Sequence, residues 1–591
     1  MKAIQFIKQR VWLLAIFIFV LAFGLRLLAA LKMAWWPSEI NYVDWAGQWF
    51  AQHFWQYLFQ FSHKISPPDV GAFGNPPFAM WLLSSGIYVA TKLHFSVLIG
   101  ARMINVFLGS ITAVYLFYFG KKWFSLLVGL LAALSFVFIP VIVTNNASAY
   151  LDTLLAFLVL MALDLTYRYF QDRKPLYLYL LGLVLGLCLL TKFVIIPIIF
   201  VIWVMVIIVL IRNRKFKYLT FFLIITIFVP FLLWSGLRDP QQIKDLFFVY
   251  KNNIYNPYPI KYPTPIFLYY YLMILGILPP IVLIGGLYEV ILLIKNIIKS
   301  NWKKFRREIL ILILIIVFIT FNTFFARYTT THQLITILPL MLILVALGFE
   351  HLFSYVRDRR LKLVIFLIIL FSLITPLFSF KPEFWGLYSS SFVGGADTSF
   401  KLYGGELDGS GVPEVAKFLK ENTPEDSRIA VVDYDWLFPK YDKERNYPPI
   451  FLDDGLIGAY SRGFEYVVIP RVYLEVKSQT QADFSKLEPI FTFKVKNIVL
   501  AKVYKIDYSK IQTVDNIPLG SQYSWGIESE NNSPIYNVES GELKIDYQFE
   551  KSFPDYTPED NRFILTQKKD FDLTKASGIY FEAYGDGEEK L

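Results

Sequence analysis

The sequence predicts a polytopic α-helical membrane protein with about eleven spans, followed by an extracytoplasmic region that combines a small α/β unit with a β-sandwich-like segment. Its 591 residues are 55% hydrophobic and 18% charged, with a mean hydropathy of +0.47, whereas a soluble domain carries about 25% charged residues. Several apolar runs exceed the roughly 18 residues that distinguish a membrane span from a buried core helix. Charge is sharply divided: residues 1–380 hold 33 Lys and Arg against 12 Asp and Glu, and residues 381–591 hold 24 against 35. These observations exclude a purely soluble enzyme and a disordered chain, and the single cysteine, Cys188, excludes an internal disulfide.

The first span is expected at residues 11–31, directly after the basic N-terminal segment of residues 2–10. This apolar run is too long for the hydrophobic region of a signal peptide, and no small-residue cleavage site follows it. Further spans are expected at 96–119, 124–143, 150–169, 176–191, 194–211, 218–236, 265–294, 309–325, 331–350 and 363–380.

The orientation of these spans depends on residues 78–93, which are apolar but short for a span. If this segment lies at the outer interface, nearly all the dense basic clusters fall on the side of the N-terminus. The positive-inside rule therefore favours an interfacial helix at 78–93 and a cytoplasmic N-terminus. Residues 381–591 are then extracytoplasmic, and the spans lie in a plasma or inner membrane. The same distribution of basic residues between apolar runs argues against a nucleic-acid partner.

The first external loop carries a run of aromatic residues at 42–63, which is typical of an interfacial helix. Its composition fits a wall of a lipid-headgroup site and a plain anchoring belt equally well.

Beyond residue 380 the pattern changes. A helix is expected at 412–420 and buried strands at 428–432 and 464–470, which indicates a small α/β domain over residues 381–505. Short strands at 543–549, 563–567 and 578–584 indicate a β-sandwich-like region over residues 516–591. This region is short for a sandwich, so its sheet is expected to be incomplete.

Acidic residues are scarce on the predicted outer side of the membrane half, and ionisable groups near a bilayer are costly to keep. Glu39 and Asp44 lie in the first external loop, and Asp152 opens the fourth span. The basic residues expected at the same level are Arg102, Lys192 and Arg327. Carboxylates beside cations suit a site that holds a lipid-linked phosphate while a carboxylate deprotonates an acceptor hydroxyl. For Asp152 an equally good alternative is the favourable interaction of an acid with the first turn of a helix.

Other kinds of site are poorly supported. The five histidines show no HExxH spacing, and the sequence contains no P-loop and no GxSxG motif. No metal site is predicted.

Four short motifs follow one another in the membrane half: residues 37–45 (PSEINYVDW), 75–78 (NPPF), 150–157 (YLDTLLAF) and 190–193 (LTKF), with Arg327-Tyr328 as a weaker fifth. In order and spacing they resemble the GT-C superfamily of polyprenyl-phosphate-sugar-dependent glycosyltransferases, specifically the protein O-mannosyltransferase and aminoarabinose transferase group related to glycosyltransferase family 39. The resemblance covers about residues 10–380. It departs from the family at Ser38, where aspartate is usual, and at Asn75, where lysine or histidine is usual.

The resemblance implies a GT-C-type fold and an inverting transfer of a sugar from a polyprenyl-phosphate donor to an extracytoplasmic acceptor hydroxyl on a protein, lipid or glycan. No cofactor is indicated beyond the polyprenyl-phosphate-linked sugar as donor substrate. The predicted base is Glu39, with Asp152 as its partner, and Ser38 leaves Asp152 and Asp44 as substitutes. The remaining predicted roles are the donor-phosphate ligands Lys192, Arg327, Arg102 and Tyr328, and the substrate-loop residues Tyr42, Asn75, Pro76 and Pro77.

Two alternatives to an active transferase stay open at the level of sequence. A transporter or flippase of lipid-linked sugars would need more mid-span charges than Arg26, Asp164 and Glu289, together with paired halves. A catalytically inactive GT-C relative is the other alternative, because Ser38 and Asn75 both depart from the family. If Glu39 is the base, Glu39→Gln abolishes transfer and leaves the protein folded.

Overall fold

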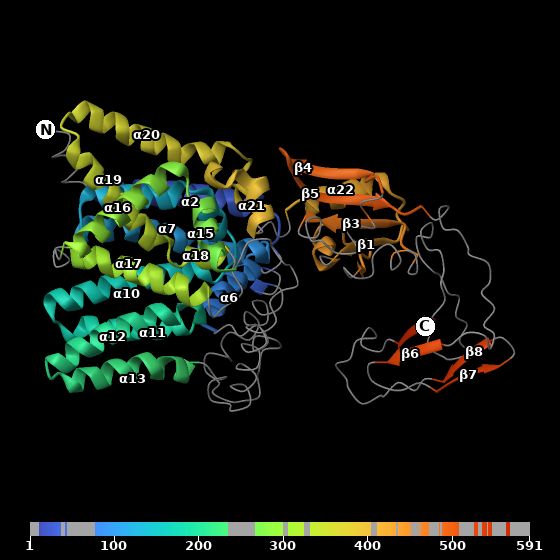
Figure 1. Ribbon diagram of the computed structural model, residues 1–591, viewed down its shortest axis with the longest axis horizontal. Coiled ribbons are helices and arrows are strands. Elements are labelled where there is room, and N and C mark those ends of the chain that lie inside the picture. Colours follow the sequence, from blue (N-terminus) through green and yellow to red (C-terminus); the bar gives the residue numbers. More distant parts are fainter. Residues whose placement is uncertain are drawn as a thin grey trace.

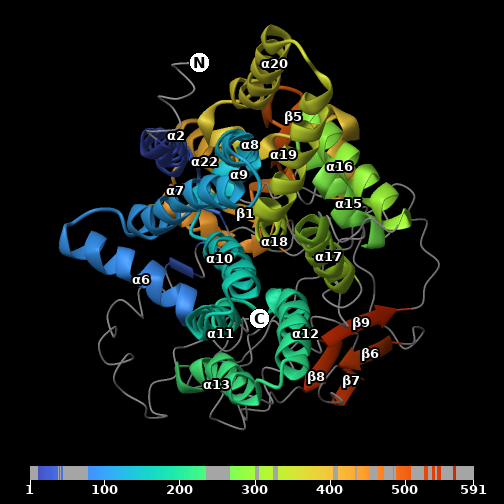
Figure 2. The same ribbon diagram turned by 90° about the vertical axis from the view of Figure 1, so that its left-hand side faces the viewer.

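A computed structural model describes the following residues: 11–36, 39, 42–43, 77–233, 266–299, 305–323, 331–403, 410–432, 435–450, 459, 463–471, 484, 487–507, and four strands at 525–529, 535–539, 542–546 and 563–567. Figure 1 shows a bundle of long helices with a small sheet domain beyond one of its ends, and Figure 2 shows the same helices from the opposite end. Apart from Tyr42 and Val43, the aromatic segment expected at 42–63 lies outside the described residues.

The long helices of the bundle occupy most of the segments that hydropathy predicts. They are α2 (Val11–Lys32), α7 (Val97–Trp123), α8 (Leu126–Phe138), α10 (Asp152–Asp172), α11 (Pro175–Leu189), α12 (Ile196–Arg212), α13 (Phe216–Leu233), α15 (Ile266–Ile277), α16 (Pro280–Ile298), α17 (Arg306–Phe321), α19 (Leu338–Tyr355) and α20 (Arg359–Phe378).

Eight helices within the described residues are long and apolar enough to cross a membrane, or nine if the bent pair α8 and α9 (Pro140–Ala147) forms one span. The predicted count of eleven is therefore not confirmed. The three predicted spans without a counterpart among the eight correspond to the bent α8–α9 pair, to α11 with 15 residues and to α17 with 16. The segment expected at 265–294 still contributes one candidate, α16, although it is split at Leu278-Pro279 into α15 and α16. Proline has no N–H to donate to the carbonyl four residues earlier, so it interrupts a helix.

Three shorter helices lie between the spans. The segment 78–93 forms α6 (Pro77–Lys92), a helix of 16 residues, which packs against α7. The short α18 (Thr331–Ile335) precedes α19, so the helix expected over 331–350 begins with a break. The 3₁₀ turn η2 (Phe193–Ile195) precedes α12.

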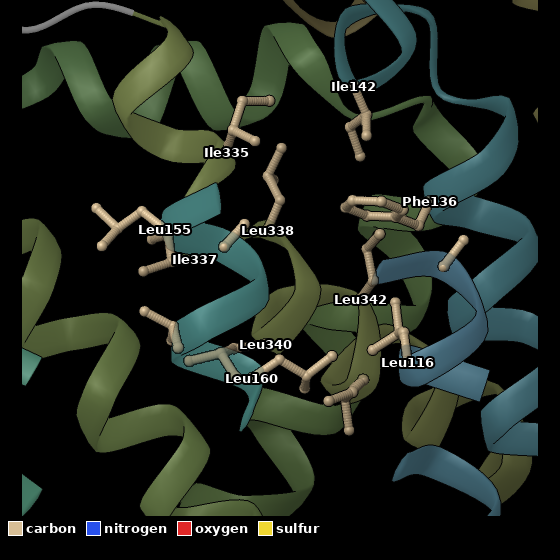
Figure 3. Close-up of a cluster of buried hydrophobic side chains, with 14 of the residues drawn as sticks. Leu116, Phe136, Ile142, Leu155, Leu160, Ile335, Ile337, Leu338, Leu340 and Leu342 are labelled. Atoms are coloured by element: carbon tan, nitrogen blue, oxygen red, sulfur yellow. The ribbon is translucent and has the colours of Figure 1, made fainter. Parts of the chain in front are cut away.

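The centre of the bundle is apolar and tightly packed. Figure 3 shows Phe136 and Ile142 from the α8–α9 pair approaching Leu338 and Leu342 of α19, with Leu155 of α10 nearby. α10 is the most deeply buried of the eight candidate spans. At a second crossing, a Cβ on Gly348 of α19 would collide with the carbonyl oxygen of Gly285 in α16. Small residues at helix crossings allow such close backbone contact in membrane proteins.

The bend between α8 and α9 measures 67° and has a local cause. Pro140 cannot donate to the carbonyl of Phe136, which is left without its helical partner. Arg26 of α2 supplies the missing donor, because its Nη2 lies 3.0 Å from that carbonyl oxygen. The Arg26 guanidinium is fully buried and lies 5.2 Å from the centre of the Phe136 ring. This mid-span charge therefore holds the bent pair that leads to α10.

After α20, η6 (Pro382–Leu387), η7 (Ser391–Val393) and α21 (Gly395–Tyr403) pack against helices of the bundle, and the sheet domain follows with α22 (Val412–Asn422). Its strands β1 (Ile429–Val432), β2 (Pro449–Ile450), β3 (Tyr466–Pro470), β4 (Phe491–Val495) and β5 (Ile498–Lys505) form one sheet in the order β2-β1-β3-β5-β4.

Two pairings in this sheet are parallel, with Val431 opposite Pro449 and Ala430 opposite Val467. β3 and β4 pair antiparallel with β5. β1 and β3 are buried on both faces, in agreement with the continuous apolar runs that predict them. η8 (Asp435–Lys440) follows β1.

The C-terminal strands form two antiparallel pairs. β6 (Trp525–Ser529) pairs with β9 (Phe563–Gln567), and β7 (Ile535–Glu539) pairs with β8 (Glu542–Asp546). The strand expected at 578–584 lies outside the described residues. The β-sandwich-like region and the domain boundaries stay predictions.

Candidate functional site

Glu39 forms a buried ion pair with Arg102 of α7. Arg102 Nε lies 2.8 Å from Glu39 Oε1, and Arg102 Nη2 lies 2.6 Å from Glu39 Oε2. The backbone N–H groups of Ala149 and Trp36 donate to the same two oxygens, at 2.7 and 3.0 Å. The carboxylate is 0% exposed and accepts four hydrogen bonds, which fills the positions that a carboxylate offers.

The Arg102 guanidinium is equally engaged. In addition to Glu39, it donates to the carbonyls of Ala30, Met33 and Ala34 at 2.6 to 3.0 Å. These bonds use all five of its N–H donors. The pair therefore fastens the chain that leaves α2 to the side of α7, and neither partner has a position left for a substrate atom in this geometry.

Asp152 pairs with Lys192 at the start of α10. Lys192 Nζ lies 2.9 Å from Asp152 Oδ2 and 3.1 Å from Oδ1, and His332 Nε2 of α18 lies 3.9 Å from Oδ2. The exposed side-chain fractions are 2% for Asp152, 14% for Lys192 and 9% for His332. Lys192 reaches Asp152 from the turn between α11 and η2, where its own N–H donates to the Cys188 carbonyl.

The loop of residues 148–151 links the two ion pairs. Asn105 Nδ2 of α7 donates to the carbonyls of Ser148 and Tyr150, both at 2.6 Å, while the Ala149 N–H donates to Glu39. The loop is thus held on both sides immediately before Asp152. The structure therefore brings Glu39, Arg102, Asp152 and Lys192 together at one end of the bundle.

Aromatic side chains pack around the same loop. The Tyr150 ring stacks on His332 with centroids 4.7 Å apart, and it meets Trp36 and Tyr42 edge to face at 5.3 and 6.4 Å. Tyr42, which is predicted to belong to the substrate loop, therefore lies beside Tyr150, two residues before Asp152.

The sheet domain contacts this end of the bundle. The Trp35 N–H donates to the Tyr441 hydroxyl oxygen at 2.7 Å, and Lys440 Nζ lies 5.0 Å from the centre of the Trp35 ring. Burial raises the pKa of Tyr441 to about 12, so its hydroxyl stays neutral at physiological pH. The segment before Glu39 is therefore held from one side by Arg102 and from the other by the sheet domain.

The other predicted site residues are only partly covered. Asp44, Asn75, Pro76, Arg327 and Tyr328 lie outside the described residues. Pro77 begins α6, and the N–H of the next residue, Phe78, donates to the Leu190 carbonyl at 2.9 Å. The start of α6 therefore lies next to the turn that carries Lys192.

Three residues of this region were not predicted from the sequence: Asn105, His332 and Tyr441. Asn105 is a polar residue in an apolar span, which is a signal that sequence analysis can use. His332 and Tyr441 have no such signal, because their positions depend on the packing of α18 and of the sheet domain. Among the described residues, no group of three or more His, Cys, Asp or Glu side chains has a geometry that could hold a metal ion.

Comparison with protein families gives one match. The model of the dolichyl-phosphate-mannose-protein mannosyltransferase family matches residues 74–234, the segment that contains α6, α7, Asp152 and Lys192. The match covers 161 of the 591 residues, so this segment of the membrane half is similar to that family. None of the curated proteins compared with the chain matches it.

Three solved structures are similar to the chain at low identity. ArnT from Cupriavidus metallidurans bound to undecaprenyl phosphate is 13% identical, with a TM-score of 0.45 over 83% of this chain and 97% of that one. The Archaeoglobus fulgidus oligosaccharyltransferase AglB, in complex with an inhibitory peptide and a dolichol-phosphate, is 12% identical, with a TM-score of 0.45 over 86% of this chain and 75% of that one. The apo form of the A. fulgidus enzyme is 12% identical, with a TM-score of 0.45 over 82% and 74%.

Proposed function

We propose that the chain transfers a sugar from a polyprenyl-phosphate donor to an acceptor hydroxyl, with inversion at the sugar carbon, at the outer face of the membrane. The family that matches residues 74–234 is described by a dolichyl-phosphate-linked sugar, which supports this class of donor. The observation that carries the proposal is the buried pair of Asp152 and Lys192 within that segment. It sets a carboxylate and a cation side by side where α10 and α11 meet.

Asp152 is the general base in this proposal. The acceptor hydroxyl gives its proton to the Asp152 carboxylate as the acceptor oxygen attacks the anomeric carbon of the sugar. The bond from that carbon to the phosphate oxygen breaks, and the phosphate leaves with the electron pair. Lys192 stabilises the departing phosphate with its positive charge. Arg327 and Tyr328 keep the phosphate-binding roles that the resemblance implies, and Asp44 remains a second acid in the first loop.

Glu39 and Arg102 take different roles from those that the sequence predicts. A carboxylate that already accepts four hydrogen bonds has no position for an acceptor hydroxyl, and a guanidinium that donates five has none for a phosphate. We assign both to positioning, since together they hold the loop before Asp152. Ser38, which stands where the family usually has aspartate, then does not deprive the chain of a base, because Asp152 takes that role in this proposal.

The test is transfer of radiolabelled sugar from synthetic polyprenyl-phosphate donors by the full chain in membranes, with a panel of sugars and with membrane proteins, lipids and glycans as acceptors. We expect covalent incorporation that Asp152→Asn abolishes. Asp172→Asn, an exposed position at the end of the same helix, is the matched control and retains transfer. Movement of the label across sealed vesicles without covalent product would instead identify a transporter. Binding of the donor with neither transfer nor transport would identify an inactive relative.

A further inference from the structure

The Lys192 ammonium has two tasks in the proposed reaction, and they pair it with two different anions. It donates to both oxygens of Asp152, at 2.9 and 3.1 Å, yet the proposed reaction needs it on the leaving phosphate. While it donates to both oxygens, its positive charge offsets the negative charge with which the carboxylate would attract the proton of an acceptor hydroxyl. The base and the leaving group therefore compete for one cation.

The two ion pairs of the site differ in their ability to exchange partners. Arg102 is 1% exposed and is fixed by five hydrogen bonds to three carbonyls and Glu39. Lys192 carries a compact charge on a flexible four-carbon chain, and its side chain is 14% exposed. A lysine can therefore swing between two nearby anions with little change in the backbone, whereas the guanidinium fork cannot.

Asp152 keeps other neighbours if Lys192 moves. His332 Nε2 lies 3.9 Å from Asp152 Oδ2, and its ring is held flat against Tyr150. The carboxylate also begins a helix, whose first N–H groups favour a negative charge. Departure of the ammonium therefore does not leave the carboxylate in a purely apolar setting.

We propose that the donor phosphate draws Lys192 away from Asp152, so that binding of the donor releases the base. Asp152 then accepts the proton of the acceptor hydroxyl only in the donor-bound enzyme, and His332 positions the carboxylate in that state. Donor binding therefore precedes productive acceptor binding, and Asp152 does not act as a base before the donor is in place. This inference rests on the proposed function, since it assumes a phosphate-bearing donor.

The experiment measures the dissociation constant of undecaprenyl phosphate for the full chain in detergent micelles. If Asp152 and the phosphate compete for Lys192, Asp152→Asn binds the lipid roughly 10-fold more tightly than the wild type, in keeping with the coupling of close charge pairs. Lys192→Met binds it more weakly. In the double variant Asp152→Asn/Lys192→Met, the tighter binding produced by Asp152→Asn disappears. The reason is that Lys192, the cation for which the carboxylate and the phosphate compete, is gone.

The double variant separates exchange from simple repulsion. If Asp152 only repels the phosphate, Asp152→Asn tightens binding equally with and without Lys192, and the exchange is refuted. Unchanged binding by Asp152→Asn refutes it as well. Lys122→Met is the matched control, since Lys122 lies 3.8 Å from the buried Asp164 at the other end of α10 and should leave the affinity unchanged. Failure of the wild type to bind undecaprenyl phosphate at all would contradict the proposed function itself.

A second measurement avoids substitutions that disturb folding. A membrane-permeant carbodiimide joins a carboxylate to a contacting lysine amine through an amide bond, which mass spectrometry detects. We expect an Asp152–Lys192 cross-link in the wild type that undecaprenyl phosphate suppresses and the uncharged undecaprenol does not. A cross-link that persists at saturating undecaprenyl phosphate overturns the exchange.

Discussion

Two buried carboxylates on one helix, Asp152 and Asp164 of α10, have opposite surroundings. They are twelve residues apart, or about 18 Å along the helix axis. Asp164 accepts from Trp123 Nε1 at 2.6 Å, from the Tyr115 hydroxyl at 2.8 Å and from Arg168 Nε at 2.8 Å. Asp152 is held by one lysine, with His332 further away.

The difference matches the roles proposed for the two acids, a structural one for Asp164 and a chemical one for Asp152. The donors around Asp164 are two aromatic side chains of α7 and an arginine one turn along α10, and ring N–H and hydroxyl groups of packed side chains have little freedom to leave. Arg307 of α17 adds to this end, because its Nη1 donates to the Trp123 carbonyl and its guanidinium stacks on the Trp123 ring. Burial alone therefore does not identify a catalytic carboxylate, since both acids are buried and their hydrogen-bond donors differ.

The largest expected effect is that of Asp152→Asn on transfer. Removing a general base typically lowers the rate by about 10²–10⁴-fold, and we expect a loss in this range, measured as initial rate of labelled sugar transfer. The thermal unfolding midpoint should fall less than in Glu39→Gln, since Lys192 is 14% exposed and Arg102 is 1% exposed. A variant that retains more than a tenth of the wild-type rate would remove Asp152 from the chemistry.

The next prediction concerns Glu39→Gln. Breaking a buried ion pair costs about 3–5 kcal/mol because it leaves an uncompensated charge, so the variant should unfold at a lower temperature. Replacing both Glu39 and Arg102 by leucine should recover part of this loss. If Glu39→Gln instead keeps its unfolding midpoint and loses transfer as completely as Asp152→Asn, Glu39 is the base after all.

Asp164→Asn should show the reverse pattern from Asp152→Asn. We expect a loss of about 3 kcal/mol in the free energy of unfolding, at the lower end for a broken buried pair, because the amide keeps one acceptor oxygen. The transfer rate per folded molecule should stay near that of the wild type. Detergent-solubilised protein can be assayed for both, with Asp172→Asn as the exposed control.

Asn105→Ala tests the loop that presents Asp152. It leaves the carbonyls of Ser148 and Tyr150 without their shared donor, which costs about 1–3 kcal/mol for buried groups. We also expect roughly a tenfold lower transfer rate, since small displacements of a catalytic group reduce rates strongly. Asn105→Asp, which keeps the size but loses the amide donors, should behave in the same way. A rate unchanged by either substitution would show that the loop holds Asp152 without them.

The smallest expected effect is that of Tyr441→Phe, which removes one hydrogen bond to Trp35, worth about 1 kcal/mol. Because burial raises the pKa of Tyr441 to about 12 from an ordinary 10.0, its contribution is complete below pH 10. It is lost between about pH 10 and 12, where the unfolded tyrosine ionises and the folded one does not. The stability advantage of the wild type over Tyr441→Phe should therefore shrink and then change sign over this interval, as measured by unfolding at a series of pH values. A constant difference would contradict the raised pKa.

Much of the membrane architecture could be predicted because hydropathy is a property of short segments. The helices α7, α10 and α13 lie where apolar runs predict them, and β1 and β3 lie where continuous buried strands were expected. The division of 265–294 was missed although Pro279-Pro280 signals it. The sheet order could not be predicted, because β5 pairs with β3 across a long intervening segment.

By itself the sequence determined that the chain is a membrane protein and which acids and bases are scarce enough to matter, because transfer free energies and motif order are local properties. Only the tertiary structure decided which charges meet. Glu39 joins Arg102 across 63 residues, Lys192 joins Asp152 across 40, and Tyr441 reaches Trp35 across 406. These pairings arise from how helices and the sheet domain pack, and the roles proposed for Glu39 and Asp152 rest on them.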